Sequence, residues 1–124
     1  MAQNFTAMTL SAATNGLPIK ILATATAGTT IHTATTSDMP EGCDEVWLWA
    51  GSTIASAING SLYFGGDPSA TRQITFRAPA AFNGPVPILA GHRVCDGVVI
   101  SATASVGEGL LIWGNVNRIS GQGT

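Results

Sequence analysis

Two histidines and seven acids are the first residues of this chain to consider for chemistry. His32 and His92 could each act as a general base, because histidine titrates near neutral pH. Serine is abundant, but no stretch matches the Gly-x-Ser-x-Gly turn that presents a hydrolase nucleophile. Four of the seven acids fall within residues 38–45, so no pair is set apart for glycoside cleavage. We therefore expect that this protein is not an enzyme.

The two histidines and two cysteines have the ligand count of a structural zinc site. His92 and Cys95 are three residues apart, but His32 and Cys43 are eleven apart and no Cys-x-x-Cys unit is present. This spacing favours a hydrogen-bonded strand histidine over a metal ligand. Two cysteines are also too few for a disulfide scaffold, which favours free, buried thiols. We therefore expect no metal and no cofactor.

Four acids crowd one predicted loop and the start of the strand after it. Several carboxylates on a flexible loop could bind a hard cation, but their spacing does not match a calcium-binding loop. We expect a solvated acidic loop that holds Asp38, Glu41, Asp44 and Glu45.

Trp47 and Trp49 alternate along a predicted strand, so both side chains point to one face. Val46 and Leu48 occupy the opposite face, and Tyr63 could join the tryptophans from a neighbouring strand. Exposed aromatic rings on a sheet can stack on sugars, and aromatic residues also dominate subunit interfaces. Apolar residues on both faces of one strand indicate that one face binds a partner. Either a sugar or a protein could be that partner.

Alternating apolar and β-branched residues predict strands and almost no helix. Asn-Gly and Asp-Gly pairs supply the positive φ of tight turns, and turn signals recur about every ten residues. The pattern indicates an all-β fold: an antiparallel β-sandwich of about eight to nine strands, for which a jelly roll is one arrangement. The predicted strands are 18–27, 29–35, 45–50, 53–57, 61–64, 71–77, 86–90, 94–104 and 110–119.

The strand pattern divides the chain into an extended N-terminal arm, residues 1–17, and a single β-sandwich domain, residues 18–124. The arm lacks strand alternation, and we expect two of its apolar residues, Phe5 and Met8, to anchor on a partner or a neighbouring copy. The alternative is an N-terminal strand that folds onto its own sandwich.

The composition of the chain is poor in charge. Only 10% of residues are charged, against about 25% in an average domain, while 45% are hydrophobic. This balance argues against disorder and a coiled coil, and five basic residues with a net charge of −2 argue against nucleic-acid binding. No apolar stretch approaches the length of a membrane span, and we see no secretory signal. So few charged residues predict that neighbouring protein molecules cover much of the surface of this domain.

Four blocks of the sequence resemble a group of short structural proteins from tailed bacteriophages. They are residues 29–34 (TTIHTA), 44–50 (DEVWLWA), 64–68 (FGGDP) and 114–119 (GNVNRI), within a resemblance that spans roughly residues 20–120. Small β-sandwich or jelly-roll proteins of this size commonly serve phages as capsid decoration, or cement, proteins. The pair Cys43 and Cys95 departs from the group and casts no doubt on the fold.

The resemblance implies a homo-oligomer on the virion surface, assembled in the host cytoplasm, with the major capsid protein and copies of itself as partners. We expect Phe5, Met8, Trp47, Trp49, Arg72 and Arg77 to make capsid or inter-subunit contacts. Arg72, Arg77, Arg93 and Arg118 could pair with an acidic shell, solvated strand ends being the alternative. A head–tail junction, tail or fibre-base protein is the second interpretation, and a carbohydrate-binding β-sandwich module is the alternative of another class.

Overall fold

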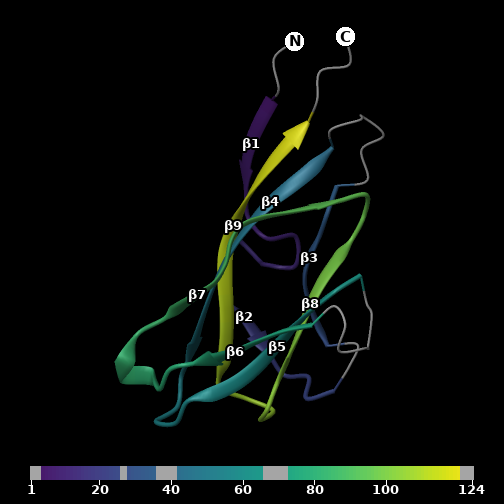
Figure 1. Cartoon of the computed structure of the whole chain (residues 1–124). Helices are drawn as coiled ribbons and strands as arrows, with labels where there is room; N and C mark the ends of the chain where they lie inside the picture. Colours follow the sequence, from purple (N-terminus) through teal and green to yellow (C-terminus); the bar gives the residue numbers. More distant parts are fainter. Residues whose placement is uncertain (1–3, 26–27, 36–41, 66–72, 121–124) are drawn as a thin grey trace.

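The computed structural model describes residues 4–25, 28–35, 42–65 and 73–120. Within them the chain forms nine strands in two antiparallel sheets, with one short 3-10 turn, η2 (Ala81–Asn83) (Figure 1). The strands are β1 (Asn4–Met8), β2 (Ile19–Ile21), β3 (Thr29–Thr33), β4 (Cys43–Ser52), β5 (Ile58–Phe64), β6 (Gln73–Ala78), β7 (Val86–Cys95), β8 (Val99–Ala104) and β9 (Leu110–Ser120). The prediction of an all-β antiparallel sandwich is confirmed.

The strand order is that of a jelly roll. Sheet A runs β1-β9-β4-β7, with β2 also pairing β9, and sheet B runs β3-β8-β5-β6. Six of the eight connections between the described strands cross from one sheet to the other, and only those from β1 to β2 and from β5 to β6 stay within a sheet, an arrangement that matches a jelly roll. In the described residues, no helix is long and apolar enough to cross a membrane.

Alternation along β4 and β9 builds the core between the sheets. Val46, Leu48 and Ala50 of β4 are fully buried, while the residues between them face outward and stay partly exposed. Burial of one set of alternate side chains is what period-two patterning produces in a sandwich. The other fully buried large apolar residues are Leu10, Ile21, Ile31, Ile58, Leu62, Ile100, Leu110, Ile112 and Ile119.

Three of the predicted strands differ from the structure. Of the strand predicted at residues 18–27, only β2 (Ile19–Ile21) forms, and residues 22–25 lie outside any strand. The other two predictions fail at turns. Residues 53–57 form bends instead of a strand, because the Ser52 hydroxyl accepts from the Ile54 amide (3.1 Å) and donates to the Ser56 carbonyl (2.9 Å). Residues 94–104 divide into the end of β7 and all of β8, because Asp96 and Gly97 adopt left-handed φ values of 58° and 74°. Local turn chemistry therefore overrides strand propensity at both places.

The described part of residues 1–17 lies on the domain itself. β1 pairs with β9 in antiparallel register, from Asn4 opposite Ser120 to Met8 opposite Val116 (Figure 1). Leu10 is buried in the core, and the Ala12 amide donates to the Ile31 carbonyl of β3 (3.2 Å). The segment is thus an edge strand of sheet A followed by a crossing to sheet B, which is the second of the two alternatives for the arm.

The expectation of two free thiols is wrong, because Cys43 and Cys95 form a disulfide. The two residues lie directly opposite each other on β4 and β7, although 52 positions separate them in the sequence. Spacing alone could not show this proximity, because it depends on the register between two strands that other elements separate along the chain.

Candidate functional site

The outward side of sheet A carries all three tryptophans of the chain. Trp47 and Trp49 alternate along β4, and the register between β4 and β9 places Trp113 opposite Trp49 and Asn115 opposite Trp47. All three indoles are partly exposed. Side chains directly opposite on antiparallel strands lie within contact distance, so these residues share one surface, which we call the tryptophan face.

Two glycines give the indoles room to lie against the sheet. A Cβ atom at Gly51 would lie 3.2 Å from Cη2 of Trp113, and one at Gly91 would lie 3.0 Å from Cζ2 of Trp47. Gly91 also has a left-handed φ of 76° at a β-bulge in β7, a conformation that favours glycine. The indole rings of Trp47 and Trp113 therefore lie close against the backbone of the sheet.

The tryptophan face is hollowed on both sides of Trp113. One hollow of about 380 Å³ is lined by Trp49, Pro85, Trp113, Gly114 and Asn115. A smaller one of about 150 Å³ lies between Trp113, Pro85 and the η2 turn, where Gly51 and Leu111 form part of the wall. Apolar walls with one amide at the rim suit a partner side chain or a ring with few polar groups.

The same side of sheet A becomes polar toward the other end of β4. Glu45 lies between Asn117 of β9 and Arg93 of β7 in the register. The Arg93 Nε atom is 3.8 Å from Glu45 Oε2, and the arginine side chain is largely exposed. The face therefore has an aromatic half and a polar half.

The structure brings together Trp47 and Trp49, and it adds Trp113, which the sequence reasoning missed. The signal was present, because Leu111, Trp113 and Asn115 alternate on one face of the predicted strand 110–119. Tyr63 does not join them, since it lies on β5 in sheet B, where it is buried and its hydroxyl lies 3.4 Å from Thr103 Oγ1.

The other predicted contact residues lie away from the tryptophan face or outside the described part. Met8 is partly buried and packs against the chain's own core. The backbone of Phe5 lies opposite Ile119, but the Phe5 side chain lies outside what the structure describes. Arg77 is exposed on β6 of sheet B, and Arg72 lies outside the described residues.

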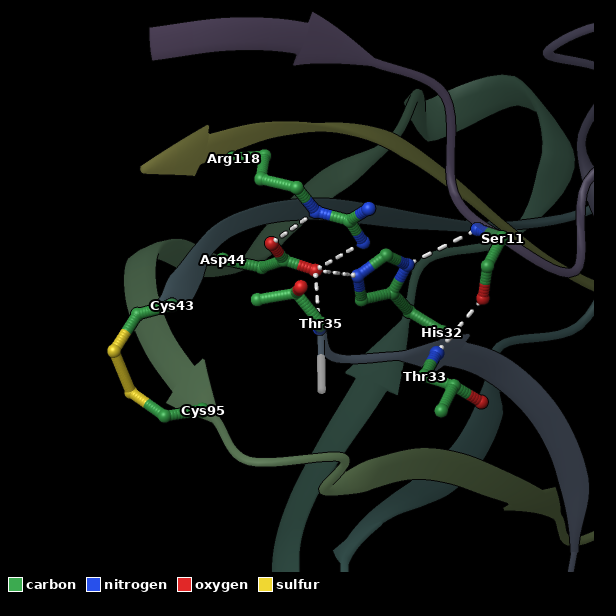
Figure 2. Close-up of polar contacts among 8 residues, drawn as sticks. All are labelled: Ser11, His32, Thr33, Thr35, Cys43, Asp44, Cys95 and Arg118. Carbon is green, nitrogen blue, oxygen red and sulfur yellow. Dashed lines mark hydrogen bonds and ion pairs between the residues drawn. A yellow bond between two sulfur atoms is a disulfide. The ribbon is translucent and has the colours of Figure 1, made fainter. Parts of the chain in front are cut away.

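Asp44, expected in a solvated acidic loop, is fully buried on the inward side of β4 (Figure 2). Arg118 of β9 donates to both carboxylate oxygens, from Nε to Oδ1 at 2.9 Å and from Nη2 to Oδ2 at 3.0 Å. The Thr35 amide donates to Oδ2 as well (3.2 Å). Arg118 therefore pairs inside the domain, contrary to both expectations for it. Of the remaining predicted loop acids, Asp38 and Glu41 lie outside the described residues.

His32 links this pair to the N-terminal segment (Figure 2). Its Nε2 atom is 2.7 Å from Asp44 Oδ2, and its Nδ1 accepts a hydrogen bond from the Ser11 amide (3.0 Å). Because Nδ1 accepts, the ring proton lies on Nε2 and is donated to Asp44. The Ser11 hydroxyl accepts from the Thr33 amide (2.7 Å), so serine, histidine and aspartate are close but are not arranged as a nucleophile with its base.

Burial would raise the pKa of Asp44, but hydrogen bonds from Arg118 and His32 outweigh it and hold that pKa below its ordinary value. The carboxylate is thus charged and satisfied inside the sandwich. We assign this network of Ser11, His32, Asp44 and Arg118 a structural role, since it ties β3, β4, β9 and the N-terminal segment together. Cys43 and Cys95 bind each other, so they cannot complete the zinc site considered above, and the described residues contain no cluster of three or more metal-ligating side chains.

Comparisons with known proteins add little to this geometry. No protein-family model and no curated protein matches the chain. Among solved structures, the CBM36-1 domain of a multidomain xylanase from the hindgut metagenome of Trinervitermes trinervoides is similar, with a TM-score of 0.44 and 17% sequence identity. The similarity covers 98% of this chain and 100% of that domain. A likeness at this level carries no argument about binding.

Proposed function

We propose that this chain is a non-catalytic structural protein of a tailed-bacteriophage virion, a decoration protein that docks through its tryptophan face. The observation that carries the proposal is the gathering of all three tryptophans, partly exposed, on the outward side of sheet A. The sequence resemblance to small virion proteins supports it. The jelly-roll strand order supports it at the level of fold analogy, since capsid proteins commonly use that architecture.

Docking through tryptophans suits a cement protein energetically. Tryptophan is among the residues that carry most of the binding energy at protein interfaces, in pockets surrounded by a polar rim. A protein that binds only the assembled shell stabilises that shell by mass action, without any reaction. Only 10% of residues are charged, so covering this surface costs little desolvation of charge.

The partners in this proposal are the major capsid protein and further copies of the chain on the virion surface, after assembly in the host cytoplasm. A head–tail junction, tail or fibre-base position is the second placement, because the same face would serve there. Copy number in purified particles separates the two. Hundreds of copies indicate the shell, and a dozen or fewer indicate a junction or tail.

The test of the docking surface is occupancy of phage particles by chains that carry Trp49→Ala or Trp113→Ala. We expect both variants to fold and to lose most of their occupancy. Leu17→Ala is the matched control, because Leu17 is an exposed apolar residue in a loop and we expect its substitution to leave occupancy unchanged. Folded tryptophan variants that occupy particles as well as the native chain would contradict the proposal.

Carbohydrate binding is the candidate of another class, and the tryptophan face itself favours it. Indole rings that lie against a sheet, with Asn115 at the rim of the hollow, could stack on sugar rings and hydrogen-bond their hydroxyls. Binding of the native chain to a glycan array, lost in the folded Trp113→Ala variant, would establish this function in place of shell docking.

A further inference from the structure

The free edge of sheet B is the strand β6 (Gln73–Ala78), which pairs with β5 in an unbroken register from Tyr63–Gln73 to Ile58–Ala78. On the other side of β6, no strand or backbone hydrogen bond is present among the described residues. An open edge presents a row of unpaired N–H and C=O groups, and natural sheets protect such edges against pairing.

Other edges of the sandwich show such protection. β7 at the edge of sheet A contains β-bulges at Ile88 and Gly91 and also Pro87, which has no N–H to donate. At the opposite edge of sheet B, the N-terminal segment covers β3: the Ala12 amide donates to the Ile31 carbonyl, and the Ser11 hydroxyl accepts from the Thr33 amide.

Among the described residues nothing covers β6 in this way, and the one edge-protecting feature of β6 itself is the exposed charge of Arg77. The strand contains no proline, glycine or bulge, and it carries Ile74, which is 40% exposed. Of the exposed large apolar residues in the described part, Ile74 alone lies in a strand. β1 is a second open edge, but its exposed side chains that the structure describes, Thr6 and Ala7, are small.

The sequence of β6 is complementary to itself in antiparallel register. A two-fold axis through Thr75 places Ile74 opposite Phe76 of the second copy and Gln73 opposite its Arg77. Ile74 and Phe76 lie on the inward side of sheet B with Leu62 and Gly60, while Gln73 and Arg77 lie on the outward side. Apolar residues therefore meet apolar ones, and an amide meets a cation, with the two arginines kept apart.

We propose that β6 is a self-association edge: two copies pair through antiparallel β6 strands, centred on Thr75, into one continuous sheet. The interface is isologous, as a two-fold dimer requires, and it covers the exposed Ile74. It lies in sheet B, so it leaves the tryptophan face of sheet A free, and it does not depend on the virion proposal.

Sedimentation of the full chain over a range of concentrations tests this edge. We expect a monomer–dimer equilibrium that Ile74→Lys shifts strongly to monomer. Ile54→Lys is the matched control, because Ile54 is 38% exposed in the bends after β4 and we expect it to leave the equilibrium unchanged. A native chain that stays monomeric at every soluble concentration, or an Ile74→Lys variant that dimerises like the native chain, overturns the proposal.

Charge substitutions at Gln73 test the register. Gln73→Glu faces Arg77 of the second copy and should tighten the dimer, whereas Gln73→Lys should weaken it, with a difference of about tenfold in Kd between the two. Hydrogen exchange should also slow at residues 73–78 as concentration rises. Equal Kd values for the two variants, or a dimer that Trp113→Ala abolishes while Ile74→Lys does not, overturn the proposal. The second result would assign self-association to the tryptophan face instead.

Discussion

The tryptophan face and the buried network around Asp44 use opposite sides of the same strand, β4. On the outward side, alternate residues such as Trp47 and Trp49 form an apolar platform that solvent reaches. On the inward side, Asp44 binds Arg118 and His32 in the interior. The residues that look suited to chemistry are therefore occupied in holding the fold together. The residues that look suited to a core form the surface available to a partner.

Substitution of the two adjacent carboxylates of β4, Asp44 and Glu45, should give the largest difference in stability between its two sides. Asp44→Asn removes the charge that holds Arg118 and His32, so we expect the free energy of unfolding to fall by about 3 kcal/mol. Glu45→Gln is the matched control on the opposite face. The ion pair of Glu45 with Arg93 is long and partly exposed, so we expect a change within about 0.5 kcal/mol. Urea denaturation measures both, and equal losses would contradict the contrast.

Removal of the disulfide tests how far the network holds this end of the sandwich alone. Cys43 precedes Asp44 directly, and the bond closes a loop with a sequence separation of 52. The chain-entropy relation gives about 4 kcal/mol for such a loop, with about 2–4 kcal/mol typical in practice. We expect Cys43→Ser with Cys95→Ser to unfold at lower urea but to keep its near-UV circular dichroism. Unchanged stability of the double variant would contradict a stabilising role for the disulfide.

Acid should weaken the inward side of β4 through Asp44. Its pKa is lowered in the folded state, so the stability it contributes is fully present above its unfolded pKa and is lost as pH falls through the folded one. The window therefore lies below the ordinary value of 3.8. We expect thermal unfolding of the native chain to depend more steeply on pH there than unfolding of Asp44→Asn. Parallel pH profiles for the two chains would show that this carboxyl does not contribute.

The tryptophan face should show the smallest effect on stability. Trp113→Ala removes a partly exposed ring and with it the cross-strand pairing with Trp49, a pair of the kind worth roughly 0.2–1 kcal/mol beyond alanine. We expect a loss of about 1 kcal/mol in urea denaturation, together with the larger loss of docking described above. A loss as large as that of Asp44→Asn would mean that the indole belongs to the structural core.

Much of the fold was predictable from local pattern. Alternation at residues 45–50 and 110–119 located β4 and β9, and the opposite faces of Val46 and Trp47 were assigned correctly. The prediction of a strand at residues 53–57 was wrong because the hydroxyl of one serine, Ser52, stabilises bends there through two hydrogen bonds. β1 was predicted only as the alternative to an extended arm, because its five residues lack clear alternation and it forms by pairing with β9.

The residues of the candidate site show the same contrast between what local pattern predicts and what strand pairing reveals. Local pattern identified Trp47 and Trp49, because faces on one strand follow from the pleat alone. Trp113 required knowledge that β9 lies beside β4 with that residue opposite Trp49. The assignment of Asp44 to a solvated loop failed for a related reason. Its partner Arg118 is 74 residues away in the sequence.

Local sequence pattern was enough to predict an all-β sandwich with little charge and with aromatic residues on one face of a strand. Period-two alternation and turn residues act over a few positions, so they can be read along the chain. Three further features became visible only in the folded chain: the tryptophans share a face, Cys43 is bonded to Cys95, and Asp44 is buried with Arg118. Those contacts depend on strand order and register, which are set by packing the whole chain into one core.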